Sequence, residues 1–96
     1  MDDSQLKAKA ARYREILAQT QAPPRACDPK VKGPDPMAMA SHAIWMCERV
    51  PRLCVEGNSA QAKEWVRFVE GLLWCTGVLS LEDMARDGLA PSILRA

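Results

Sequence analysis

The sequence predicts an all-α fold, an antiparallel helical hairpin with a short fourth helix, preceded by an N-terminal helix on a proline-rich arm. Apolar residues recur every three or four positions in several segments, which is the spacing of a helix face that packs on a core. No segment alternates apolar and polar residues as a half-buried strand does. Gly57 and Gly77 directly follow two of the periodic segments, where a helix commonly ends. At 96 residues, the chain has the length of one domain.

This pattern divides the chain into an N-terminal helix at residues 1–20, a proline-rich linker at 21–36, and a core at 37–96 that holds the hairpin, the short C-terminal helix and a tail. The first helix is expected from about Ser4, whose hydroxyl would cap it, to Thr20. Its buried side is predicted by one apolar stripe: Leu6, Ala10, Tyr13 and Leu17.

Basic residues lie around the rest of this first helix: Lys7, Lys9, Arg12 and Arg14. One interpretation is an ordinary solvated surface. The other is a face that binds an anion, a ligand or a partner. That candidate face consists of Lys9, Arg12 and Arg14, with Tyr13 at its edge.

The linker holds five of the seven prolines: Pro23, Pro24, Pro29, Pro34 and Pro36. Proline lacks the amide donor and fixes φ, so we expect neither a helix nor a central strand there. The linker could pack across the helices of its own chain, or it could let the first helix dock on another subunit. Composition leaves both arrangements open.

The second helix is predicted to begin at Asp35-Pro36, as a cap followed by proline in the first turn, or one turn later at Ser41. Pro51 falls inside it, where the ring removes one backbone hydrogen bond. We expect a kink there rather than an end, with the helix continuing to Val55. The Gly57-Asn58 turn then joins it to the next helix.

The third helix contains the segment Trp65–Gly77, with two of the three tryptophans and the only phenylalanine. We expect its buried stripe to consist of Ala62, Trp65, Val66, Val69, Leu72, Leu73 and Thr76. The fourth helix should begin at Ser80, with acidic residues in its first turn, and end at Asp87-Gly88. Its inward residues would be Leu81, Met84 and Ala85, and the apolar tail from Leu89 to Leu94 would lie back on the hairpin.

Trp74 falls opposite the apolar stripe of the third helix, among polar residues. Tryptophan is enriched where proteins contact one another, and Gly71 in a helix interior costs about 1 kcal/mol relative to alanine. Either the linker or the first helix covers Trp74, or it contacts a second subunit or a target. The candidate protein-binding residues are Lys63, Arg67, Glu70, Gly71 and Trp74.

The cysteines and the single histidine do not form a recognisable reactive site. Cys27, Cys47, Cys54 and Cys75 include no Cys-x-x-Cys pair, so we expect three buried helical thiols, one looser thiol in the linker, and no metal. A metal site or a redox pair is the alternative. His42 is interpreted as a capping or packing residue. We therefore expect no enzyme activity, no catalytic residue and no cofactor.

Charge and hydropathy exclude several classes of partner. The formal net charge is +1, which gives no general electrostatic case for nucleic acid. No apolar run approaches the roughly 20 residues of a membrane span. The N-terminal residues are acidic and polar, unlike a signal peptide, so a cytoplasmic location without membrane contact is expected.

Two segments, His42-Ala43-Ile44-Trp45-Met46 and Trp65–Trp74, resemble a group of small proteins encoded by tailed phages and prophages. Their pattern is His-x-x-Trp-Met, then Trp-x-x-Phe-Val-x-Gly-x-x-Trp, then a glycine and a Ser/Thr-aliphatic-acid-acid-Met segment. Arg67 and Glu70 stand where that pattern tends to have glycine and glutamine.

The resemblance implies a phage-borne accessory protein in the cytoplasm of the host cell. We therefore expect a non-enzymatic protein that binds and inhibits a host bacterial protein, of the anti-defence or host-takeover type. One alternative is an oligomer that sequesters a nucleotide signal, and another is a component of the virion or its assembly. A homo-oligomer is expected because 48% hydrophobic residues is generous for so small a helical domain.

Overall fold

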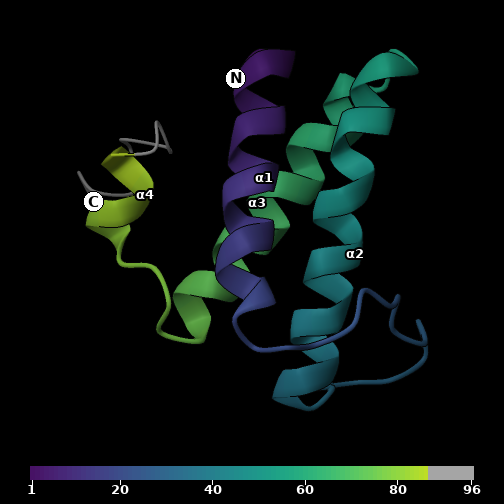
Figure 1. The fold of residues 1–96 in the computed structure, drawn as a ribbon, viewed down its shortest axis with the longest axis vertical. Coiled ribbons are helices and arrows are strands. Elements are labelled where there is room, and N and C mark those ends of the chain that lie inside the picture. The colour runs from purple at the N-terminus through teal and green to yellow at the C-terminus, as the bar shows by residue number, and fades with distance from the viewer. Residues whose placement is uncertain (87–96) are drawn as a thin grey trace.

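The structure, a computed structural model, describes residues 1–86 and confirms the all-α prediction. Four helices follow one another along the chain: α1 (Asp3–Ala18), α2 (Pro36–Val55), α3 (Ser59–Cys75) and α4 (Leu81–Arg86). The described part of the chain contains no strand. Helices α1, α2 and α3 pack on one another around the core, and α4 stands to one side beyond a short extended segment (Figure 1).

Helix α1 begins and ends slightly earlier than predicted. Its N-cap is Asp2, and the prediction of Ser4 is wrong, because the Asp2 carboxylate accepts a hydrogen bond of 2.8 Å from the Gln5 amide. The Gln5 side chain accepts in turn from the Asp2 amide at 2.9 Å, which completes a capping box. The helix ends at Ala18 rather than Thr20, and the Thr20 hydroxyl donates back to the Leu17 carbonyl.

The proline-rich linker packs on its own chain. The Arg25 amide donates to the Ser41 carbonyl at 3.2 Å, and the Cys27 amide donates to Nδ1 of His42 at 3.0 Å. Ala22 is buried. The linker is therefore fastened to the first half of α2, and α1 packs against α2 and α3 of the same chain rather than extending away on an arm.

Helix α2 begins at the earlier of its two predicted starts. The Asp35 carboxylate accepts from the Ala38 amide at 2.8 Å, and Pro36 occupies the first turn, so the alternative start at Ser41 is wrong. The helix continues through Pro51 to Val55, as expected. Gly57 then ends it with a φ of 77°, a left-handed conformation that glycine adopts without strain.

Helix α3 ends in the same way as α2. Gly77 has a φ of 80°, and the Val78 amide donates back to the Leu73 carbonyl at 2.8 Å. Helix α4 has the predicted start, because the Ser80 hydroxyl accepts from the Asp83 amide at 3.0 Å. The expected stop at Asp87-Gly88 and the apolar tail lie outside the described residues, as do the side chains of Met84 and Ala85.

The core lies between α1, α2 and α3, and four predicted stripe residues of α1 are all buried in it. On α3 the predicted buried stripe is partly wrong. Glu70, which was not assigned to the stripe, is buried. Trp65 and Leu72 are only partly buried, and Thr76 is exposed.

Among the helical thiols, Cys47 and Cys54 are buried as expected, and burial raises the pKa of Cys47 to about 12. Cys75 is exposed, so the prediction of three buried helical thiols is wrong.

Candidate protein-contact site

One side of α3 points away from the core and is exposed along almost the whole helix, with Phe68 at its edge against His42 of α2. Its residues recur at steps of three and four, so they share one face. We call this surface the outer face of α3. It consists of Glu64, Arg67, Phe68, Gly71, Trp74 and Cys75, all of them exposed.

Two large aromatic side chains lie on the outer face. Phe68 is 54% exposed and Trp74 is 49% exposed. Neither the linker nor α1 covers Trp74, so the first of the two interpretations of this residue is wrong. Exposed single apolar residues are common on proteins, but two aromatic side chains on either side of a glycine form a surface that suits contact with another molecule.

Gly71 has no role in the fold that requires a glycine. A positive φ, which favours glycine, occurs at Gly33, Gly57 and Gly77 but not at Gly71. A Cβ built at Gly71 would meet no described atom within 4 Å. Glycine in a helix interior costs about 1 kcal/mol relative to alanine, so the chain gives up stability at a place where its own packing gains nothing. Something outside the chain that approaches the backbone closely would account for this residue.

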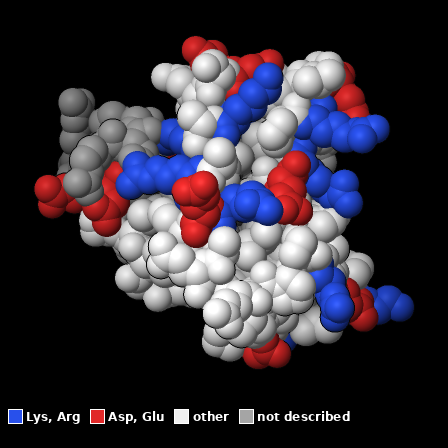
Figure 2. All heavy atoms as spheres, in the orientation of Figure 1, with Lys and Arg blue, Asp and Glu red and all other residues white. Residues whose placement is uncertain are grey.

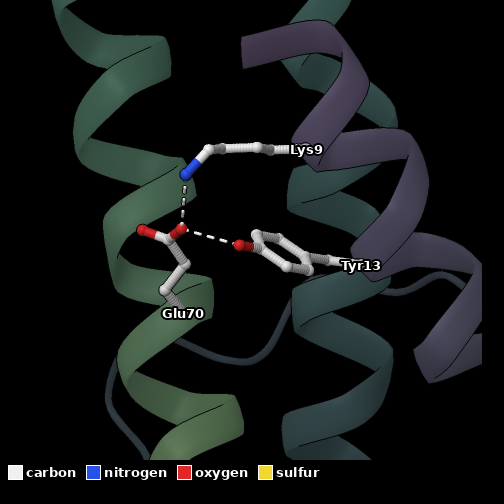
Figure 3. Close-up of polar contacts among 3 residues, drawn as sticks. All are labelled: Lys9, Tyr13 and Glu70. Atoms are coloured by element: carbon white, nitrogen blue, oxygen red, sulfur yellow. Dashed lines mark hydrogen bonds and ion pairs between the residues drawn. The ribbon is translucent and has the colours of Figure 1, made fainter. Parts of the chain in front are cut away.

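Glu70 was predicted on the protein-binding surface, and the structure corrects this placement. Glu70 is 3% exposed and points toward α1 rather than outward. Its Oε2 accepts a hydrogen bond of 2.7 Å from the Tyr13 hydroxyl and lies 3.3 Å from Nζ of Lys9 (Figure 3). We call Lys9, Tyr13 and Glu70 the buried polar cluster. The four remaining predicted contact residues are Lys63, which is partly buried, and the exposed residues Arg67, Gly71 and Trp74.

The buried polar cluster joins α1 to α3 in the middle of the core. Burial raises the pKa of the Glu70 carboxyl, whereas the hydrogen bond from Tyr13 and the positive charges of Lys9 and Arg67 lower it. Lys9 is only 8% exposed, so its ammonium group depends on this carboxylate as a counter-charge. These contacts fix the position of α1 on α3.

The predicted anion-binding face on α1 does not form as one surface. Lys9 and Tyr13 are buried against Glu70, and Arg14 contacts Glu48 of α2 with Nη2 2.8 Å from Oε2. Of the four predicted residues, Arg12 and Arg14 are exposed on α1. On the face shown in Figure 2, acidic and basic side chains are intermingled, which does not favour binding of an anionic ligand.

Sequence reasoning missed an aromatic row that runs between α2 and α3. The His42 and Trp45 rings stack with their centroids 5.5 Å apart, and Trp45 lies 5.6 Å from Trp65. Phe68 meets the edge of His42 at 6.4 Å, and the guanidinium of Arg49 lies 4.4 Å from the Trp45 ring. The spacing of positions 42, 45 and 49 on one helix, and 65 and 68 on the next, is the signal that could have revealed this row.

His42 also connects the aromatic row to the linker. Because Nδ1 accepts the Cys27 amide, the neutral ring carries its proton on Nε2. A hollow of about 380 Å³ opens between the linker and the two helices. Its lining includes Cys27, Val31, Pro34, His42, Phe68 and Leu72. Phe68 therefore belongs both to this hollow and to the outer face of α3. The packing interpretation of His42 is confirmed.

The chain matches no family model, no curated protein and no solved structure. None of the helices in the described part of the chain is long and apolar enough to cross a membrane. Among the same residues, no group of three or more histidine, cysteine, aspartate or glutamate side chains is placed to hold a metal ion. The outer face of α3 is the candidate site because Phe68 and Trp74 are exposed on it and a Cβ at Gly71 would meet open space there.

Proposed function

We propose that the protein is a small, phage-encoded, non-enzymatic protein that binds and inhibits a host bacterial protein through the outer face of α3. The observation that carries this proposal is the arrangement of Phe68, Gly71 and Trp74. Two exposed aromatic side chains flank a glycine that the fold itself does not require. Aromatic residues that enter a pocket of a partner often dominate the energy of a protein interface.

The rest of the molecule supports this role as a scaffold. The buried polar cluster and the apolar core fasten α1 and α2 to the opposite side of α3, so its outer face is presented on a packed helix. A binding surface on a packed helix loses less side-chain and backbone entropy on association than one on a loose segment. The alternative, an oligomer that sequesters a nucleotide, was suggested by the basic face of α1. Lys9 and Tyr13 of that face are buried against Glu70, so this alternative has less support.

Capture from a lysate of the organism that carries the gene tests the proposal. Immobilised wild-type protein is expected to retain one host protein at a constant ratio, and Gly71→Arg is expected to retain at least tenfold less, because the arginine stands where the partner must approach. Ala11→Arg adds the same charge at an exposed position of α1 and should retain the wild-type amount.

Unfolding curves of the variants show whether each is folded before capture is compared. The proposal fails if no host protein is retained by the wild type. It also fails if folded Gly71→Arg and the wild type retain the same host protein equally.

A further inference from the structure

We propose that the outer face of α3 is self-complementary, and that two copies of this chain pair through it with their α3 helices antiparallel and crossing at Gly71. In such a pair, a residue that precedes Gly71 by a given number of positions meets the residue of the second copy that follows Gly71 by the same number. The order of residues along the face fits this requirement. Phe68 and Trp74 lie three positions on either side of Gly71, and Arg67 and Cys75 lie four positions on either side.

Each aromatic side chain would therefore meet an aromatic side chain. Phe68 of each copy faces Trp74 of the other, so the pair contains two equivalent aromatic contacts related by the two-fold axis. Both side chains expose about half of their surface in the single chain, at 54% and 49%. Aromatic pairs of this kind stabilise an interface beyond the area that they bury.

The glycine lies where the two backbones would be closest. Helices with ordinary side chains at their contact pack 8 to 10 Å apart, and a small residue at the crossing allows a closer approach. A Cβ at Gly71 meets no described atom of its own chain within 4 Å, so this space is open to a second helix. The symmetric pair therefore gives the glycine the role that the single chain does not.

Charge and area are also compatible with a second copy. The face carries one acidic and one basic residue, Glu64 and Arg67, so it does not repel itself. Arg67 would lie beside the last turn of the other α3, where backbone carbonyls carry partial negative charge. A standard interface buries about 800 Å² per partner and takes about 20 to 30 residues on each side, so a patch of this size forms a small contact. A reversible dimer is expected rather than an obligate one.

If the proposed function holds, the dimer also affects how the protein binds its target. Because the host protein and the second copy would occupy the same face, the host protein can bind only after the second copy has dissociated. Only the monomer would therefore inhibit its target. The dimer itself does not depend on the existence of a target.

A cysteine opposite the native Cys75 tests the arrangement and keeps Gly71. Arg67→Cys should form a disulfide with Cys75 of the second copy on mild oxidation, because positions four before and four after Gly71 meet in the antiparallel pair. Ala11→Cys places the new thiol at an exposed position of α1 and measures linkage by random collision. We expect Arg67→Cys to link at least tenfold faster. Equal rates for the two variants would overturn the proposed geometry.

Sedimentation equilibrium of the unmodified chain tests the dimer without any new thiol. The mean mass should rise toward twice the chain mass of 10.6 kDa as the concentration reaches the millimolar range, and Gly71→Arg should stay at the single mass. A wild type that remains monomeric overturns the dimer. If that monomer still captures a host protein, the proposed function stands. If the dimer forms but capture does not respond to Gly71→Arg, the proposed function fails and the dimer stands.

Discussion

Replacement of Glu70 by alanine should lower the free energy of unfolding by about 3 kcal/mol, the magnitude found when one partner of a buried ion pair is removed. The change leaves the Lys9 ammonium group, only 8% exposed, without its counter-charge. It also leaves the Tyr13 hydroxyl without the carboxylate that accepts its hydrogen bond at 2.7 Å. Urea denaturation followed by circular dichroism measures the effect.

The matched control is Glu64→Ala on the same helix. Glu64 is exposed on the outer face, so its removal should change the free energy of unfolding by less than about 0.5 kcal/mol. Similar losses for the two variants would show that Glu70 does not have the buried position described above. A Tyr13→Phe variant should lose about 1 to 2 kcal/mol, because it removes only the hydrogen bond and keeps the ring.

Replacement of Pro51 by alanine should instead raise the free energy of unfolding by about 1 to 2 kcal/mol. Proline in a helix interior is about 3 kcal/mol less favourable than alanine. Part of that difference is offset, because the proline ring also restricts the unfolded chain. Pro51 is exposed, so its loss removes little packing, and alanine supplies an amide that can donate to the Cys47 carbonyl.

The neighbouring position provides the control for Pro51. Arg52 is exposed and pairs with Glu56 one turn later at 3.0 Å, a contact that contributes about 0.3 to 0.5 kcal/mol. Arg52→Ala should therefore change stability only slightly and in the opposite direction. A Pro51→Ala variant that is less stable than the wild type would contradict this expectation and would show that the fold depends on the proline ring at this position.

The helix ends could be predicted from the sequence because local residues determine them. Gly57 and Gly77 end α2 and α3 with positive φ, and Asp35 caps α2 in front of Pro36, all as the sequence suggests. The predicted start of α1 at Ser4 is wrong, and the cause is also local. Asp2 and Ser4 are both good caps, and only Asp2 has Gln5 three positions later to complete the box.

The buried polar cluster could not be predicted from α3 alone. The apolar stripe of α3 defines one buried side, but Glu70 lies at the edge of that stripe and faces α1. Its partner Tyr13 is 57 positions away, so no local spacing reveals the contact. The exposed positions Arg67, Gly71 and Trp74 were predicted correctly as outward-facing, because they lie far from the edge that α1 covers.

If the outer face of α3 serves contact with another protein chain and not the fold of its own chain, the fold should tolerate a side chain at Gly71. The most direct measurement is the free energy of unfolding of Gly71→Ala in dilute solution, compared with that of the wild type. We predict that it rises by about 0.5 to 1 kcal/mol, because alanine favours the helix and the added Cβ meets open space. A loss of stability in Gly71→Ala would show that the fold itself needs the glycine, and Gly71 would then no longer indicate a partner at this face.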